Sequence, residues 1–368
     1  MIRMGRDISR RQFLAGAGAM GSAMWMGVER LSAEEADPRV AQIVARTIAV
    51  DMHNHVNVPY ARTAADAKPV PAIDLAGQIK RSGFSAICET YNIDGLAEPQ
   101  TGDYSKYFLQ GLDFEDQLLK RNHMHRALTL QDLEAAHQAG QPIIAQSTEG
   151  AQFIEGHLDR IEEAYKRGLR HLQLVHERDD MVAPLGDVYT APAHLGGLTD
   201  AGAEVIRECN RLGILVDMAH GTDATVRGAL KVATQPFIIS HTGLARETDN
   251  ADMRRRLIDR ELARAVAGAG GVIGVWWRLS DTLGDYVRGV KAMVDAVGID
   301  HAGIGTDTNL TSSNMLPYTN QIWPDQNGGF FYAVAGEMLK QGFTPEEIGK
   351  FGGGNFCRVF GKATAARS

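Results

Sequence analysis

The sequence predicts an α/β fold of the TIM type, a (β/α)8 barrel, on three observations. Eight short apolar, β-branched runs alternate with helical stretches along 368 residues. Eight such units over about 320 residues fit this barrel. Histidines or carboxylates follow six of the eight runs, which is where a barrel places its catalytic residues. A doubly wound open sheet is the alternative, because it is built from the same units.

The predicted strands determine the candidate site, because its residues follow the points where the strands end. They are Thr47–Asp51, Phe84–Glu89, Pro142–Ser147, Arg170–Val175, Gly213–Met218, Pro236–Ser240, Gly271–Trp276 and Ala302–Thr306. The clearest helix between them follows Thr199, which can cap it, and ends before Gly213. The segments Asp159–Gly168 and Thr222–Val232 have a similar pattern. No repeat and no Gly/Ser-rich or Pro-rich linker divides the chain, which predicts one domain.

One connection is unusually long for this fold. The segment Glu98–Phe114 lies between the second predicted strand and its helix. Loops between a strand and a helix are normally much shorter. We therefore expect this segment to cover the site or to contact a second subunit in a homodimer.

The composition restricts the class of protein. The chain is 44% hydrophobic and 23% charged, which is ordinary for a globular fold with a large core. Its formal charge of −7 gives no indication of a nucleic-acid partner, which normally requires a basic face. The three cysteines, Cys88, Cys209 and Cys357, are far apart, so they indicate buried apolar residues rather than disulfides or a CxxC site.

Residues 1–33 are expected to be a twin-arginine export signal outside the fold. Arg10–Arg11 is followed by the weakly apolar stretch Phe13–Val28, which is too short and too rich in glycine for a stable membrane span. Cleavage after Ala33 would leave one barrel domain, residues 34–368, in the periplasm or outside a bacterial cell. An uncleaved amphipathic anchor is the alternative. The twin-arginine export machinery carries folded proteins, so a metal site could be assembled before transport.

The residues at the predicted strand ends are types that bind metals. They are His53 and His55 after the first strand, Glu149 after the third, His176 after the fourth, His220 after the fifth, His241 after the sixth and Asp307 after the eighth. A single histidine at a strand end is usually a hydrogen-bonded loop residue, and a single carboxylate is usually a helix cap. So many residues of these types on one rim are hard to explain in that way.

Imidazole and carboxylate ligands suit zinc, although manganese and cobalt accept the same ligands. The set is too large for one tetrahedral ion, so it predicts two Zn2+ ions with Glu149 bridging them. His53 and His55 would hold one ion, and His220 and His241 would hold the other.

Such a metal pair activates water for hydrolysis of an amide or a similar bond. Asp307 would orient this water and carry its proton to the leaving group. His176 would polarise the carbonyl or stabilise the oxyanion.

Longer segments give a more specific indication. In chain order they are "DMHNH", "STEG", "LQLVH", "GGLTDAGAEVIRECNRLGILVDMAH", "PFIISH", "GIDHAGIGTD" and "GGGNFCRVF". With them the chain resembles the membrane (renal) dipeptidase family of zinc peptidases, in the amidohydrolase superfamily, over Ile48–Gly361. The resemblance implies a (β/α)8 barrel with two zinc ions that hydrolyses dipeptides, often with a D-residue at the C-terminal position.

The resemblance also implies the roles of individual residues. His53, His55 and Glu149 fall on the ligands of one metal, and Glu149, His220 and His241 on those of the other. Asp307 falls on the acidic residue that handles the water proton, and His176 on the histidine that contacts the oxygen of the scissile bond.

The family further uses an arginine after the sixth strand to hold the substrate carboxylate. The best match here is Arg255, with Arg254 and Arg256 adjacent. A planar guanidinium suits this role because it can pair bidentately with a carboxylate.

The chain departs from the family pattern in several places. The family usually has His-x-Asp after the first strand, where this chain has His53 and His55. The segments "ERDD" after His176, "TNLTSS" after Asp307 and "VWWRL" at the seventh strand also differ. Most of these changes surround the substrate, so two alternatives to a dipeptidase stay open. One is an exported amidohydrolase acting on an N-acyl amino acid, a cyclic amide or a lactone. The other is a non-catalytic metal-binding or ligand-binding module.

Overall fold

The computed structural model of the chain describes residues 37–56, 72–96, 99–179, 183–311 and 316–365. The predicted export signal, residues 1–33, lies outside the described residues. Among the residues described, no helix is both long and apolar enough to span a membrane.

The strands form two entirely parallel sheets. The first sheet has the order β3-β2-β1-β9 and the second β4-β5-β6-β7-β8. Their bounds are β1 Val50–His55, β2 Ala86–Asn92, β3 Ile143–Glu149, β4 His171–Gln173, β5 Leu215–Asp217, β6 Ile238–Thr242, β7 Val272–Val275, β8 Ala302–Ile304 and β9 Thr308–Asn309. Each of the eight predicted strands overlaps an observed one.

The two sheets meet at both sides, which gives the (β/α)8 arrangement. On one side a backbone bridge joins Gln146 of β3 to Leu169, just before β4. On the other side β9 follows β8 closely and pairs with β1. There the backbone N–H of Asp307 donates to the His53 carbonyl over 2.9 Å. The last part of the barrel is therefore joined directly to the first.

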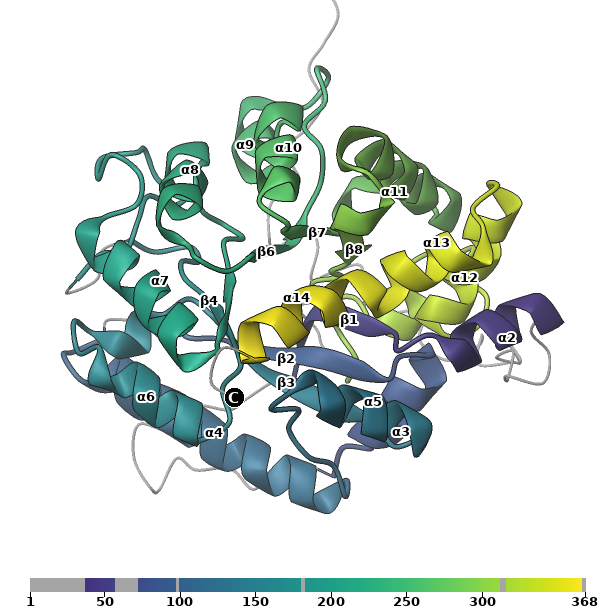
Figure 1. Cartoon of the computed structure of the whole chain (residues 1–368), viewed down its shortest axis with the longest axis horizontal. Coiled ribbons are helices and arrows are strands. Elements are labelled where there is room, and N and C mark those ends of the chain that lie inside the picture. Colours follow the sequence, from purple (N-terminus) through teal and green to yellow (C-terminus); the bar gives the residue numbers. More distant parts are fainter. Residues whose placement is uncertain (1–36, 57–71, 97–98, 180–182, 312–315, 366–368) are drawn as a thin grey trace, which may run out of the picture.

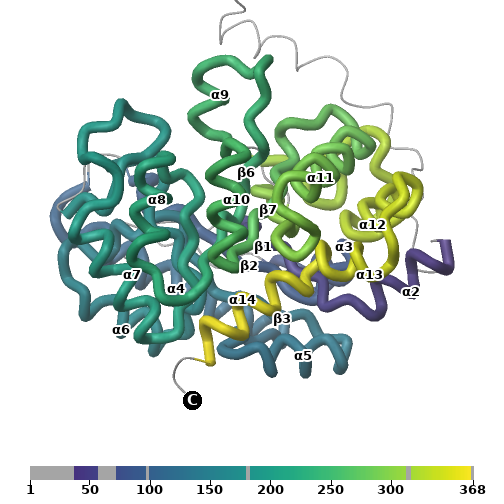
Figure 2. Tube along the Cα trace, turned by 45° about the horizontal axis from the view of Figure 1, so that its top comes forward, coloured from purple at the N-terminus to yellow at the C-terminus, as the bar shows by residue number. Residues whose placement is uncertain are grey.

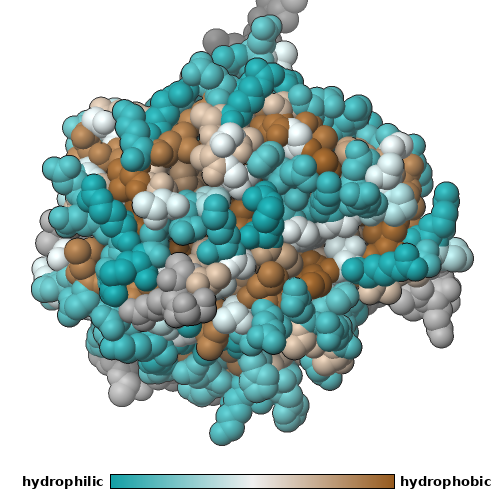
Figure 3. Space-filling model, viewed as in Figure 1, coloured by the Kyte–Doolittle hydropathy of each residue, from teal (hydrophilic) through white to brown (hydrophobic). Residues whose placement is uncertain are grey.

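Helices surround the strands (Figure 1). They are α2 Pro38–Arg46, α3 Leu75–Ser82, α4 Asp103–Arg121, α5 Leu130–Gln138, α6 Asp159–Lys166, α7 Asp200–Leu212, α8 Asp223–Val232, α9 Ala251–Arg256, α10 Arg260–Gly268, α11 Leu283–Val297, α12 Phe330–Lys340, α13 Pro345–Gly349 and α14 Asn355–Thr364. Hydrophilic residues cover most of the protruding surface in Figure 3, and hydrophobic residues lie in the hollows between them. The helices thus turn their apolar sides towards the strands.

The predicted helix after Thr199 is confirmed as α7. The Thr199 side chain accepts a hydrogen bond from the Gly202 N–H over 3.0 Å, and Gly213 ends the helix with φ 83°. The prediction that Glu98–Phe114 is a long loop was wrong, because α4 already begins at Asp103. Apolar residues at three- and four-residue spacing, such as Tyr104, Tyr107 and Phe108, bury one face of this helix.

The last helix, α14, closes one end of the barrel (Figures 1 and 2). Phe356 and Phe360 stack on each other and belong to the same buried cluster as Val50 and Ile238, which are the first residues of their strands. The interior is therefore filled at the end where the strands begin. The opposite end, where the strands finish, remains for a functional site.

Candidate active site

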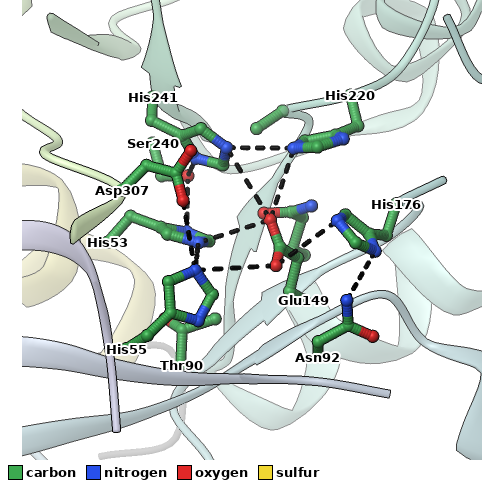
Figure 4. A network of polar contacts seen from close by, with 12 residues as sticks. His53, His55, Thr90, Asn92, Glu149, His176, His220, Ser240, His241 and Asp307 are labelled. Carbon is green, nitrogen blue, oxygen red and sulfur yellow. Dashed lines mark hydrogen bonds and ion pairs between the residues drawn. The ribbon is translucent and has the colours of Figure 1, made fainter. Parts of the chain in front are cut away.

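The side chains predicted as a site converge at the ends of the strands (Figure 4). They are His53 and His55 of β1, Glu149 of β3, His241 of β6, and His176, His220 and Asp307 from the segments after β4, β5 and β8. Four of the predicted strands extend further than expected, and in three of them, β1, β3 and β6, the extension places His53, His55, Glu149 and His241 within strands rather than after them. The prediction ended strands at their first polar residues, but here these polar residues are themselves buried.

Glu149 lies at the centre of the group. Its Oε1 is 3.4 Å from His53 Nε2, 3.3 Å from His220 Nε2 and 3.7 Å from His241 Nε2. Its Oε2 is 3.8 Å from His55 Nε2 and 3.4 Å from His176 Nε2. A carboxylate whose two oxygens face different histidines is suited to bridge two ions.

The histidines form two pairs whose ring nitrogens face each other. The Nε2 atoms of His53 and His55 are 3.2 Å apart, and those of His220 and His241 are 3.0 Å apart. Two nitrogens bound to one tetrahedral zinc ion at about 2.0–2.1 Å lie roughly 3.3 Å apart. Both pairs therefore have the spacing of two ligands of one ion.

The protonation of the second pair also suits a metal. Burial lowers the pKa of His220 to about 3, and the charge of Arg256 acts in the same direction. Burial, with the neighbouring His53, lowers the pKa of His241 well below its usual value. Both rings are therefore neutral at physiological pH, as metal ligands must be. The residues present fit a metal centre.

Buried polar groups beneath the histidines hold them in place. The Asp51 carboxylate accepts hydrogen bonds from the backbone N–H of His53 and from the Thr306 hydroxyl, over 3.2 Å and 2.6 Å. The Ser240 hydroxyl lies 3.3 Å from His53 Nδ1 and 2.9 Å from His241 Nδ1. Partners of this kind fix the orientation of metal-binding rings.

His176 is held by Asp94, which was not among the site residues predicted from the sequence. Its Nδ1 lies 2.7 Å from the Asp94 carboxylate, whose other oxygen accepts the backbone N–H groups of Glu177 and Arg178. Although burial opposes it, the charges of Glu149 and Asp94 raise the pKa of His176 to about 9. This ring is therefore a cationic donor at neutral pH. The available signal was the carboxylate two residues beyond β2.

Asp307 is fixed from three directions. Its Oδ1 lies 3.2 Å from His55 Nε2, and its Oδ2 accepts the indole N–H of Trp276 over 3.0 Å. The Trp277 indole N–H donates to the Asp307 backbone carbonyl over 3.4 Å. Although burial opposes ionisation, the hydrogen bond with His55 lowers the pKa of Asp307, which is therefore ionised.

The backbone is strained at two of these residues. Asp307 has φ 51° and His220 has φ 69°, both in the left-handed region that non-glycine residues seldom adopt. Such strain is retained where the surrounding contacts over-determine the conformation, and it clusters at functional sites.

The arginine that reaches the site is Arg256 rather than Arg255. Arg256, the last residue of α9, is 7% exposed, and its guanidinium lies 3.2 Å from the His241 carbonyl and 3.3 Å from His220 Nε2. The Arg255 side chain is 53% exposed and pairs with Asp252 on its own helix. Neighbouring residues of a helix point about 100° apart, so only one of them can face the barrel here.

A cavity of about 510 Å3 lies above the group. It is lined by His55, Glu149, His176, His220 and Asp307, together with Tyr91, Tyr107, Tyr189, Trp276, Arg256, Arg278 and Glu177. Its size and its mixture of aromatic and charged walls are typical of a small-molecule site.

Comparisons with known proteins agree with this geometry. The model of the membrane dipeptidase family, peptidase family M19, matches residues 38–368. The chain is 27% identical over 261 residues to Dipeptidase verJ of Clonostachys rogersoniana, covering 68% of this chain and 63% of that relative, so it spans less than two thirds of the relative's length.

Solved structures share the fold. An amidohydrolase from Pseudomonas aeruginosa superimposes with a TM-score of 0.72 at 19% identity, over 89% of this chain and 99% of the other. A metallo peptidase from Rhodobacter sphaeroides, liganded with a phosphinate mimic of the dipeptide L-Ala-D-Ala, superimposes with a TM-score of 0.64 at 19% identity, over 86% of this chain and 99% of the other.

Proposed function

This chain belongs to the membrane dipeptidase family, peptidase family M19, and on that premise we propose that it uses two zinc ions to hydrolyse the peptide bond of dipeptides. The observation that carries the proposal is the Glu149 carboxylate, whose two oxygens face separate histidines next to a cavity that also holds a buried arginine. His53, His55 and Glu149 would hold one ion, and Glu149, His220 and His241 would hold the other.

A bound metal pair supplies Lewis acidity and water that loses a proton near neutral pH. The protein residues do the remaining work. Asp307, ionised and held by the Trp276 indole N–H, accepts the proton of the attacking water and passes it to the leaving amine nitrogen as the C–N bond breaks. The cationic His176 donates its Nε2–H to the carbonyl oxygen as negative charge develops there.

Arg256 provides the anchor for the substrate carboxylate. It is buried beside His220 and lines the cavity, and its guanidinium fork suits bidentate pairing with a carboxylate. The metallo peptidase from Rhodobacter sphaeroides is liganded with a phosphinate mimic of the dipeptide L-Ala-D-Ala, and this supports a dipeptide as the substrate here.

The test uses protein that lacks residues 1–33. Its metal content is measured first, and it is then assayed on L-L and L-D dipeptides beside N-acyl amino acids. We expect two zinc ions per chain and cleavage of dipeptides. Arg256→Ala should raise KM at least about ten-fold, the factor given by losing one charge-assisted hydrogen bond, whereas Arg255→Ala, the adjacent control, should change little.

Other outcomes would select other functions. Protein that holds two ions but leaves every dipeptide intact is not a dipeptidase. Turnover of N-acyl amino acids, cyclic amides or lactones alone would identify a different amidohydrolase. The absence of all turnover would favour a non-catalytic metal-binding or ligand-binding module. Equal effects of Arg255→Ala and Arg256→Ala would refute the assignment of the anchor.

The protein is further proposed to reach the periplasm or the medium by twin-arginine export. The support is the sequence around Arg10 and Arg11, which precedes the matched family region at residues 38–368. Replacing both arginines by lysine should block export, so that the activity stays in the cytoplasm. Fractionation that finds the activity unchanged in the periplasm would refute this route. A homodimer stays a prediction.

A further inference from the structure

We propose that the substrate carries two carboxylates, as a dipeptide with Asp or Glu at its C-terminal position, and that Arg278 binds the second one. The inference rests on the proposed dipeptidase function and specifies its substrate class. It starts from the two guanidinium groups of the cavity, Arg256 and Arg278, which both lie against the Trp276 ring.

The first guanidinium is buried and fixed. The Arg256 Cζ lies 4.6 Å from the centroid of the Trp276 ring and 5.3 Å from that of Tyr189. Its guanidinium donates a hydrogen bond to the His241 carbonyl and lies 3.3 Å from His220 Nε2. These contacts orient it beside the candidate metal centre. This places it where the α-carboxylate next to the scissile bond would lie.

The second guanidinium is exposed at the mouth of the same cavity. The Arg278 Cζ lies 5.5 Å from the ring centroids of both Trp276 and Trp277. Aromatic faces of this kind hold a guanidinium without using its hydrogen-bond donors. Within the described ranges of the chain, no carboxylate forms an ion pair with Arg278, whereas the exposed Arg255 and Arg288 pair with Asp252 and Asp285. Its donors can therefore meet a ligand.

The spacing fits one small molecule. Because the Arg256 and Arg278 Cζ atoms lie 4.6 Å and 5.5 Å from the same ring centroid, they are at most about 10 Å apart, a span that the two carboxylates of a single acidic amino acid can bridge. A neutral side chain would leave Arg278 facing water. The ion pair between Arg278 and the second carboxylate would be partly exposed to water. We therefore expect it to determine substrate selectivity more than the rate of the chemical step.

The charges of the cavity match this substrate. Besides the histidines and the engaged carboxylates Glu149 and Asp307, the described charged residues of the lining are Arg256, Arg278 and Glu177. Glu177 follows His176 and is exposed. Two cations and one anion complement an acidic dipeptide, which carries two carboxylates and one ammonium group at neutral pH. A neutral dipeptide would leave one of these cations unmatched.

The test compares nearly isosteric pairs, so that only the charge differs. The zinc-loaded enzyme is assayed on L-Ala-Asp against L-Ala-Asn and on L-Ala-Glu against L-Ala-Gln, each with the L- and the D-form of the second residue. We expect kcat/KM to favour the acidic member about ten-fold in at least one pair, the factor of one charge-assisted hydrogen bond.

Variants then locate the cause of the preference. Arg278→Ala should abolish the acid-over-amide ratio, and Arg278→Glu should shift the preference towards C-terminal Lys or Arg. Arg288→Ala is the matched control, because it removes an exposed arginine on α11 and should leave the ratio unchanged.

The outcomes separate the two levels of the proposal. Cleavage of dipeptides with no acidic preference, or with a preference that survives Arg278→Ala, would overturn this inference and leave the dipeptidase function standing. Failure to cleave any dipeptide would overturn the dipeptidase function, and this inference with it.

Discussion

The indole N–H of Trp276 holds the Asp307 carboxylate at 3.0 Å, and removing it should slow turnover. In Trp276→Phe the aromatic ring is kept, so packing against the Arg256 guanidinium is largely retained. The hydrogen bond is lost, and with it the donor that fixes Oδ2 of Asp307. The change therefore tests how strongly the position of this carboxylate determines the rate.

The magnitude follows from the charge of the acceptor. A hydrogen bond to an ionised group contributes about 1.5–3 kcal/mol. If this is expressed fully in the transition state, kcat falls roughly ten-fold to 150-fold. KM should change less, because Arg256, the proposed anchor of the substrate carboxylate, is unchanged. Trp277→Phe is the matched control, since its indole N–H reaches only the Asp307 backbone carbonyl at 3.4 Å. We expect it to lower kcat by less than about three-fold.

The assay measures kcat and KM on a dipeptide, with zinc content and Tm recorded for each variant. In an Asp307→Asn background, Trp276→Phe should have little further effect, because the group that it positions is already disabled. A Trp276→Phe enzyme that keeps its metals and turns over within two-fold of the wild type would refute the reasoning. So would equal losses in the two tryptophan variants.

Three further predictions concern metal binding and stability. Glu149→Gln should weaken metal binding on the order of 100-fold or more and abolish turnover, as measured by zinc titration. Gly305→Ala should destabilise the fold by about 3 kcal/mol in denaturant unfolding, because its Cβ would lie 1.6 Å from a β6 carbonyl oxygen; a smaller loss would mean that β8 can shift. In α4, burial and the neighbouring Glu89 raise the pKa of the Glu115 carboxyl well above its usual value. The folded state therefore holds a proton that the unfolded state releases, and stability falls as pH rises above the normal range for Glu. Glu115→Gln should therefore raise Tm at pH 8 and leave it nearly unchanged at pH 5, whereas Glu163→Gln, on the exposed face of α6, should do neither.

The strand positions and the site could be anticipated because they rest on simple periodicities. Eight apolar runs must be buried on both faces in a parallel barrel, and their ends must meet on one rim. His53, Glu149 and His241 were recognisable on that basis. The ends of the strands were harder to predict, because a buried polar residue inside a strand has the same sequence pattern as the start of a loop.

The remaining contacts depend on which way each side chain points once the helices and strands have packed, rather than on residue type. Arg255 and Arg256 are chemically identical neighbours, and only the docking of α9 decides which one turns inward. Asp94 was missed because its importance comes from one hydrogen bond to His176, which is 82 residues away in the sequence. The two indole contacts of Asp307 likewise arise only when β7 and β8 lie side by side.

The hydrogen bond from the Asp307 N–H to the His53 carbonyl joins the last part of the chain that contributes to the site to the first part. Every residue assigned to hold metal lies between positions 53 and 241, so these residues leave the ribosome well before Asp307 does. During synthesis, all the proposed metal ligands are therefore made before Asp307, the proposed proton acceptor, and before β9, the partner of β1. A chain that ended before Thr306 would lack the proposed proton acceptor and also the Thr306 hydroxyl that holds Asp51 beneath His53.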